Sequence, residues 1–243
     1  MVDLYYLNNS SIYAGFVMSP VSHTLPNFTT IAKSLQTRIA YARLSLEPLS
    51  LPDAANGEAR RTAFVRVSGE ALAVQARIGL SGDALRHEYH PRIELRLTPS
   101  DLAIEFMLPT QAWWDQRNLA GKLTLRRYRD EFRQLLLGLD LESCVGHWHG
   151  HNRCDEHFTV EHLLRPRLME AWMQTLTEGS EPLRIGRWYA VSEVSGDMVP
   201  ALVRQIEKLN AIYRFAAWTS RNDFVSMYEQ RFASWAGEAS SWR

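Results

Sequence analysis

The chain has 243 residues, of which 46% are hydrophobic and 22% are charged, ordinary values for a globular protein that exclude extensive disorder. Lysine and arginine together number 27, and aspartate and glutamate also number 27, so no overall field favours nucleic acid or an anionic membrane. The length suits one large domain, and we expect residues 1–243 to form a single domain.

The amino terminus and the two cysteines predict the cellular compartment of the protein. The first residues lack the basic region and the long apolar stretch of a secretory signal. The apolar run from Ile12 to Met18 is too short to cross a bilayer. Cys144 and Cys154 do not make a disulfide framework, so thiols or metal ligands are expected. These features predict a cytoplasmic protein that has no membrane segment.

The first elements are an irregular start and a helix. Residues 1–27 predict irregular structure with short strand-like runs. From Phe28 to Leu46 apolar residues recur every three or four positions, which predicts an amphipathic helix. Pro48 and Pro52 then indicate a loop.

The next fifty residues alternate between apolar and polar side chains, as an antiparallel meander does. One strand is predicted over residues 72–80, and a hairpin runs from Arg92 to Leu108. The hairpin residues expected to be buried on one face are Ile93, Leu95, Leu97, Ile104 and Phe106. The charged residues between them, Glu94 and Glu105 among them, are expected on a wet face.

The second half returns to helices. A helical region begins at Trp113, and Gly138 is placed to end it. The later elements are a helix at 167–177, a strand at 183–191, a helix at 198–218 and a polar helical tail at 219–243. The whole order predicts an α+β fold in which an antiparallel sheet, a meander, is flanked by helices on one face.

Two segments show an order of strands and helices that is similar to that of other domains. His90-Pro91 precedes the strand–turn–strand RIELRLTPSDLAIEFML, and LMEAWMQTLTEGSEPLRIGRWY and VRQIEKLNAIYRFA form a later helix–strand–helix. In this order, over roughly residues 85–217, the chain resembles a group of small uncharacterised bacterial α+β domains. The resemblance implies a fold and no activity.

A cluster of histidine and cysteine is the strongest chemical signal. The segment CVGHWHGHNRCDEH holds, within fourteen residues, Cys144, His147, His149, His151, Cys154 and His157. Thiolate and imidazole bind zinc, and in a strand the three histidines spaced by two would project from one side. The predicted zinc ligands are His147, His149, His151, Cys154 and His157. Glu156 would orient a ligand or act as a general base, and Cys144, which would face away, is the weakest candidate.

Several interpretations of this segment stay open. The families that use His-x-His pairs require further ligands that are missing here, because the last histidine of the chain is His162. The histidines could be half-buried residues of a sheet edge, with Cys144 as a small core residue. They could also form a closed structural zinc site with four ligands, or a catalytic site with an open position for water.

The segment from Arg117 to Arg133 is basic and lies beside Trp113 and Trp114, a composition found in nucleic-acid-binding proteins. Asp115, Asp130 and Glu131 dilute its charge, so a solvated helix face is favoured and nucleic acid is not expected as a partner. No phosphate-binding loop or nucleophile elbow occurs.

The function predicted from sequence is a cytoplasmic, non-enzymatic binding or assembly protein with a protein partner or a second copy of itself. Tryptophan and arginine, which are enriched at binding hot spots, are plentiful. The alternative is a metal-dependent hydrolase that uses His147, His149 and His151.

Overall fold

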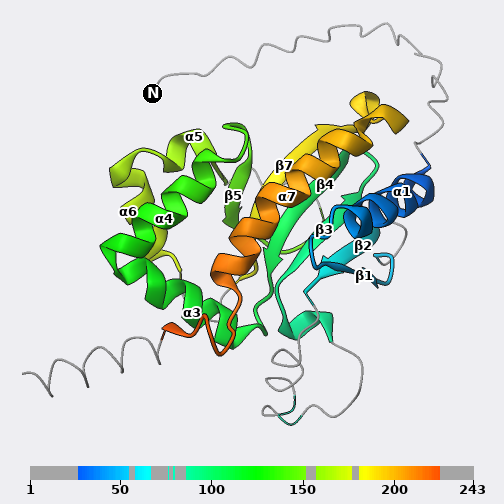
Figure 1. Ribbon diagram of the computed structural model, residues 1–243. Helices are drawn as coiled ribbons and strands as arrows, with labels where there is room; N and C mark the ends of the chain where they lie inside the picture. The colour runs from blue at the N-terminus through cyan, green and yellow to red at the C-terminus, as the bar shows by residue number, and fades with distance from the viewer. Residues whose placement is uncertain are drawn as a thin grey trace, which may run out of the picture.

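The computed structural model describes residues 27–54, 58–66, 76, 79, 86–151, 157–176 and 181–224. In these ranges seven strands form one antiparallel sheet in the order β1-β2-β3-β4-β7-β5-β6. The strands are β1 (Glu47–Ser50), β2 (Arg60–Val65), β3 (Arg92–Leu97), β4 (Asp101–Leu108), β5 (Cys144–His147), β6 (Phe158–Thr159) and β7 (Leu183–Ala190). The α-helices are α1 (Phe28–Tyr41), α3 (Trp113–Thr124), α4 (Arg126–Leu137), α5 (Val160–Leu163), α6 (Pro166–Gln174) and α7 (Val199–Ala216). The predicted α+β fold is confirmed (Figure 1).

The helices cover one face of the sheet. Figure 1 shows α7 lying across β4 and β7, with α1 toward β2 and β3, and α4 and α6 toward β5. Apolar side chains from both layers form one buried core. Ile93 lies opposite Phe106 in the β3–β4 ladder, and Leu95 lies opposite Ile104. These four side chains and Leu97 are buried, so the predicted apolar face of the hairpin is confirmed.

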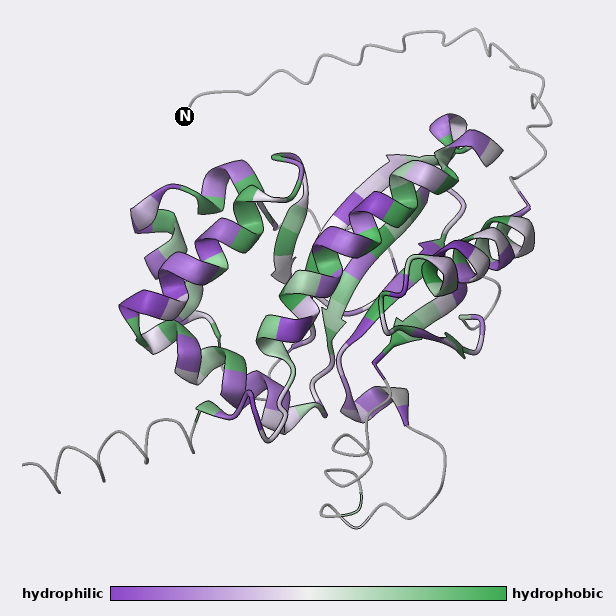
Figure 2. Cartoon of the chain, in the orientation of Figure 1, coloured by the Kyte–Doolittle hydropathy of each residue, from purple (hydrophilic) through white to green (hydrophobic). Residues whose placement is uncertain are grey.

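Local signals set several element ends. Asn27 Oδ1 accepts the N–H of Thr30 at the start of α1, as an N-cap residue does. Pro200 occupies the first turn of α7, and Gly138 ends α4 as predicted. Leu125 is extended and separates α3 from α4. Figure 2 shows hydrophilic and hydrophobic residues alternating along α4 and α7, as expected of helices that bury one side.

Two strands differ from the prediction. The loop expected around Pro48 contains β1, and β2 has no counterpart among the predicted elements. Pro48 is tolerated there because β1 is an edge strand, where a missing N–H need not interrupt a ladder. The strand predicted over residues 72–80 lies outside the described residues except for Ala76 and Gly79, and it was wrong at Ala76, which is helical.

The other predicted elements agree closely with the structure, although α1 ends at Tyr41 and not at Leu46. Residues 1–26 and 225–243, which hold the predicted irregular start and most of the predicted tail, lie outside the described residues. No helix in the described ranges is long and apolar enough to span a membrane.

The second face of the hairpin was predicted to be wet, and this was wrong. Arg92, Glu94, Arg96 and Glu105 are all buried, with exposed fractions of 3%, 1%, 0% and 0%. Alternation in the sequence placed these residues on the correct face. It could not show that their charges pair with one another, which is what permits their burial.

Candidate functional site

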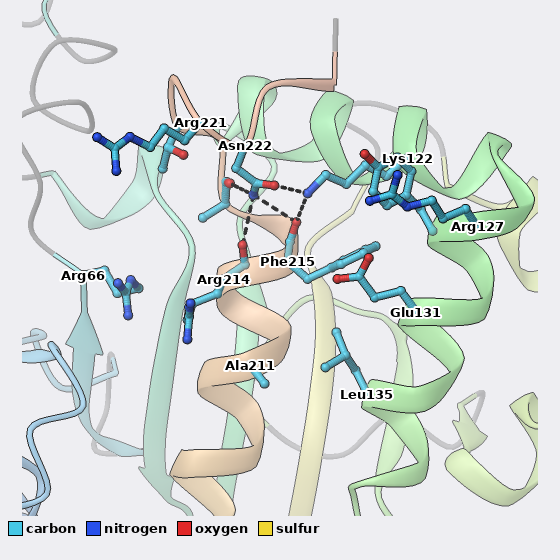
Figure 3. A pocket seen from close by; sticks show the side chains of 13 residues that line it. Arg66, Lys122, Arg127, Glu131, Leu135, Ala211, Arg214, Phe215, Arg221 and Asn222 are labelled. Carbon is cyan, nitrogen blue, oxygen red and sulfur yellow. Dashed lines mark hydrogen bonds between the residues drawn. The ribbon is translucent and has the colours of Figure 1, made fainter. Parts of the chain in front are cut away.

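A hollow of about 790 Å³ lies between α4, α7 and the segment that follows α7 (Figure 3). We call it the basic pocket. It is lined by Arg66, Lys122, Arg127, Tyr128, Glu131, Leu135, Ala211, Arg214, Phe215, Ala217, Thr219, Arg221 and Asn222. Five of these side chains are cationic and one is a carboxylate. The volume is that of a typical small-molecule site, and the charge favours an anion.

Lys122 is the most buried cation of the pocket, at 2% exposure. Its Nζ donates to the carbonyl of Phe215 at 2.7 Å and to Asn222 Oδ1, and it lies 4.6 Å from the centre of the Phe215 ring. An ammonium has three N–H donors, so one is left for a ligand. Burial lowers the pKa of Lys122 to about 8, although nearby Glu131 opposes this shift. Lys122 is therefore an incompletely solvated charge that a bound anion would stabilise.

The segment after α7 closes one end of the pocket, and Asn222 holds it in place. Asn222 Nδ2 lies within hydrogen-bond distance of the carbonyls of Arg214 (2.9 Å), Phe215 (3.2 Å) and Ala217 (2.6 Å). The last carbonyls of a helix have no partner within the helix, so Asn222 and Lys122 together cap α7. Figure 3 shows both side chains converging on the end of this helix.

Two further residues of α3 anchor the same segment. Asp115 Oδ1 accepts the N–H of Trp218 at 2.7 Å, and Asn118 Nδ2 donates to the carbonyl of Ala216 at 3.0 Å. Asp115, Asn118 and Lys122 lie three and four positions apart, so one face of α3 presents all of them to the segment. Burial raises the pKa of Asp115 to about 7, while hydrogen bonds from backbone N–H groups oppose the shift.

Arg66 approaches from the end of β2. Its Nη1 donates to the carbonyl of Leu44 at 3.5 Å and to Asn210 Oδ1 at 3.4 Å. Its backbone N–H donates to the hydroxyl of Tyr213 at 3.2 Å. All of these acceptors are neutral, so Arg66 is oriented without being neutralised.

The remaining arginines of the pocket carry unneutralised charge. Within the described ranges Arg127, Arg214 and Arg221 form no ion pair, and all three side chains are exposed. Arg127 lies 5.3 Å from the centre of the Tyr128 ring. A guanidinium without a carboxylate keeps its fork of N–H donors for a planar or tetrahedral anion.

A second set of arginines lies on the face of the sheet away from the helices, and here every arginine contacts a carboxylate. We call it the ionic face: Arg61, Arg92, Glu94, Arg96, Glu105 and Arg184. Glu94 and Glu105 are direct neighbours across β3 and β4. Arg96 joins them, with Nη1 at 3.4 Å from Glu94 and Nη2 at 2.7 Å from Glu105.

The two carboxylates of the ionic face are well supplied with donors. Glu94 accepts from Arg61 at 2.9 Å and from Arg92 at 3.0 Å. Glu105 accepts from Arg184 at 3.0 Å and from Trp188 Nε1 at 2.7 Å. Burial alone would raise the pKa of Glu94, but Arg92, Arg61 and Arg96 hold it well below its usual range. Glu94 is therefore ionised, and both carboxylates are engaged by donors.

The structure places two of the predicted zinc ligands, His147 and His151, on opposite sides of the sheet. Strand β5 ends at His147, so the expected row of three imidazoles on one strand face is not formed. His147 points into the helix layer, with its ring 6.4 Å from that of Trp172, and burial lowers its pKa. His149 is exposed, and Gly150 turns the chain with a φ of 85°.

His151 lies beside the ionic face, on the opposite side of the sheet from His147. Burial, followed by the charges of Arg61 and Arg96, lowers its pKa. Cys144 is buried with Trp148 and Trp188 on that same side, so it faces away from His147 but not from His151.

The zinc site stays a prediction. Among the described residues no three His, Cys, Asp or Glu side chains are grouped so that they could hold a metal ion. Cys154 and Glu156 lie outside the described residues, and His157 is half-buried just before β6.

The sequence indicated part of the basic pocket. Lys122 and Arg127 belong to the basic segment, which was interpreted as a solvated helix face, and this was wrong for the buried Lys122. Arg66, Arg214 and Arg221 gave no signal, because they come from distant parts of the chain. The prediction that the segment does not bind nucleic acid stays a prediction.

Comparison with known proteins gives no further guide to the site. No family model matches the chain, and no curated protein matches it either.

Proposed function

We propose that this chain is a non-enzymatic binding protein that holds an anionic small molecule in the basic pocket. The observation that carries the proposal is the imbalance of the lining, with five cations to one carboxylate around a hollow of about 790 Å³. The cationic side chains repel one another, and this excess of positive charge raises the free energy of the empty pocket. A neutral ligand would not offset that cost, whereas an anion would.

The chemistry of Lys122 supports the same proposal. Its ammonium is buried among carbonyl, amide and aromatic groups and has no carboxylate within ion-pair distance in the described ranges. A buried charge without a counterion is costly, and a bound carboxylate or phosphate would supply one. The neighbouring arginines would add bidentate hydrogen bonds.

Isothermal titration calorimetry with inorganic pyrophosphate at low ionic strength tests the proposal. We expect saturable binding with one site per chain, and we expect Arg214→Gln to weaken it by about tenfold, the loss of one charge-assisted contact. Affinity should also fall as salt is added, because the arginines are exposed.

The matched control is Arg126→Gln. Arg126 precedes Arg127 on α4, its side chain is 89% exposed, and it does not line the pocket. Pyrophosphate affinity in this variant should equal that of the wild type. No binding in the wild type, or equal losses in Arg214→Gln and Arg126→Gln, would contradict the proposal.

The wider setting of this function is also proposed. A cytoplasmic location is compatible with Cys144, which is a buried thiol. A protein partner or a second copy of the chain remains part of the hypothesis. Light scattering after size exclusion, together with a pull-down from lysate, checks it, and a strict monomer that retrieves nothing would contradict it.

A further inference from the structure

The basic pocket contains one carboxylate among its cations, that of Glu131. Figure 3 shows this carboxylate beside Phe215 and Leu135. Glu131 forms no hydrogen bond or ion pair with any residue that the structure describes. Arg127 precedes it on α4 by four positions, the spacing at which opposite charges pair on a helix, but lies over the Tyr128 ring, 5.3 Å from its centre. Glu131 is therefore an open hydrogen-bond acceptor within a basic site.

The rest of the lining is also polar for the most part. Nine of the thirteen lining side chains carry a polar group. Asn222 lies between Lys122 and Arg221 in Figure 3, and its Oδ1 accepts a hydrogen bond from Lys122 Nζ. An amide oxygen has a second lone pair, so it can accept from one more donor. Thr219 adds a half-buried hydroxyl, which can donate or accept. The pocket therefore offers hydrogen-bond acceptors as well as cations.

A simple oxyanion matches the cations of the pocket but not Glu131. The oxygens of phosphate or pyrophosphate would be repelled by this carboxylate, because both carry negative charge. An ammonium group would pair with Glu131 but would be repelled by Lys122 and the four arginines of the lining. A hydroxyl group avoids both costs, because it is neutral, donates to a carboxylate and accepts from an ammonium. Glu131 thus favours a ligand that carries hydroxyl groups.

The cations, in turn, suit a phosphate ester better than a carboxylate. Near neutral pH a phosphate monoester carries almost two negative charges, about twice the charge of a carboxylate, and has three terminal oxygens. It can therefore accept from the last N–H of Lys122 and from a guanidinium fork together. A hollow of about 790 Å³ also leaves room for a hydroxylated carbon chain beside the phosphate.

We propose that the ligand of the basic pocket is the phosphate monoester of a polyhydroxy compound, a sugar phosphate or a polyol phosphate. Its phosphate binds Lys122 and the arginines, and its hydroxyl groups donate to Glu131 and to Asn222 Oδ1. This inference rests on the proposed function and specifies its ligand class. It gives Glu131 the role of selecting hydroxylated anions over simple ones.

Pairs of phosphate esters that differ only in their hydroxyl groups test the inference. Glycerol phosphate is compared with propyl phosphate, and sorbitol phosphate with hexyl phosphate, by calorimetry at low ionic strength. The hydroxylated member of each pair should bind more tightly, and sorbitol phosphate should do so by at least about tenfold, because a hydrogen bond to a carboxylate is charge-assisted. Equal affinities within both pairs would overturn the inference and leave anion binding in place.

The variant Glu131→Ala separates the hydroxyl contact from the phosphate contact. It should remove most of the preference for sorbitol phosphate over hexyl phosphate. It should also bind pyrophosphate at least as tightly as the wild type does, because a negative charge has been removed from the pocket. A purely structural role of Glu131 would instead weaken the binding of all these ligands alike.

The matched control is Asp130→Ala. Asp130 precedes Glu131 on α4, its side chain is 67% exposed, and it does not line the pocket. This variant should keep the wild-type preference for sorbitol phosphate. Both substitutions are at exposed positions of a helix, and thermal unfolding confirms that each variant is folded.

Three other outcomes would contradict the proposal. If Glu131→Ala keeps the wild-type preference, the hydroxyl groups bind elsewhere and the role assigned to Glu131 is wrong. If gluconate, a carboxylate with a similar polyol chain, binds as tightly as sorbitol phosphate, the acidic group of the ligand is not a phosphate. If pyrophosphate and every phosphate ester fail to bind, the proposed function is overturned as well.

Discussion

Two groups of arginine side chains lie in this molecule, and their partners differ. On the ionic face, Arg96 contacts both Glu94 and Glu105, and all three are buried. In the basic pocket, Arg127 and Arg214 are exposed, and neither forms an ion pair in the described part of the chain. The arginines of the ionic face form ion pairs within the fold, whereas those of the basic pocket remain available to bind an anionic ligand. Pairing, and not the number of arginines, thus distinguishes a structural cluster from a candidate binding site.

Loss of a carboxylate should therefore cost much stability on the ionic face and almost none in the basic pocket. Glu105→Gln would leave Arg96 and Arg184 buried without their common counterion, which should lower the free energy of unfolding by about 3–5 kcal/mol. Glu131→Gln, at the exposed carboxylate of the basic pocket, should change stability by less than about 0.5 kcal/mol. Urea unfolding measures both, and similar losses would show that the distinction between the clusters is wrong.

The stability of the anchored segment should depend on pH. The folded-state pKa of Asp115 is about 7, above its usual value of 3.8, so folding favours the protonated form. The stability that protonated Asp115 contributes is fully present below about pH 4 and is lost as pH rises to about 7. Over this range the free energy of unfolding should fall by up to a few kcal/mol.

Asp115→Asn keeps the acceptor for Trp218 and removes the charge, so it should abolish this loss. Urea unfolding at several pH values gives the difference between wild type and variant. Asp130→Asn, at an exposed residue of α4, is the control. A difference between Asp115→Asn and wild type that does not change with pH would contradict the prediction.

Binding of an anion beside Lys122 should be accompanied by proton uptake. Burial lowers the pKa of Lys122 to about 8, and a neighbouring anion would raise it again. At pH 8.5 pyrophosphate binding should therefore take up a fraction of a proton, which calorimetry in buffers of different ionisation enthalpy detects. Lys122→Gln should lose the uptake, while Lys208→Gln, outside the pocket, should retain it. Uptake that persists in Lys122→Gln would place the titrating group elsewhere.

The smallest expected effect is that of substitutions in the histidine–cysteine segment on zinc content. The zinc hypothesis predicts that zinc content after chelation and reloading falls in a His147→Ala/His149→Ala double variant, and that affinity decreases below about pH 6.5. The separation of half-buried His147 from exposed His149 argues for a weak site. Equal zinc content in the two proteins, or none in either, would remove the hypothesis and the hydrolase alternative with it.

The sequence predicted the helical layer and the hairpin because their patterns are local. Ile93, Leu95 and Phe106 alternate with charged or small residues, and the period of two determines the face on which they lie. Strand β1 was missed because Pro48 resembles a loop signal, and its place at the edge of the sheet is a tertiary fact.

The sites were harder to predict than the fold because they depend on distant residues. Glu94 and Arg96 look like residues of a wet strand face until Glu105 and Arg184 are placed beside them. The histidine row looked continuous because a turn at Gly150 is not required by the sequence pattern. Only folding brings residues of β2, α3, α4 and α7 around one hollow.

A crystal of the protein soaked in selenate would test the central claim most directly, because anomalous scattering locates a bound oxyanion in both arginine clusters at once. We predict a peak in the basic pocket beside Lys122, and none at Arg96 on the ionic face, where the carboxylates already occupy the guanidinium groups. A peak at the ionic face with none in the pocket would contradict the account, since paired arginines would then be the ones that bind the anion.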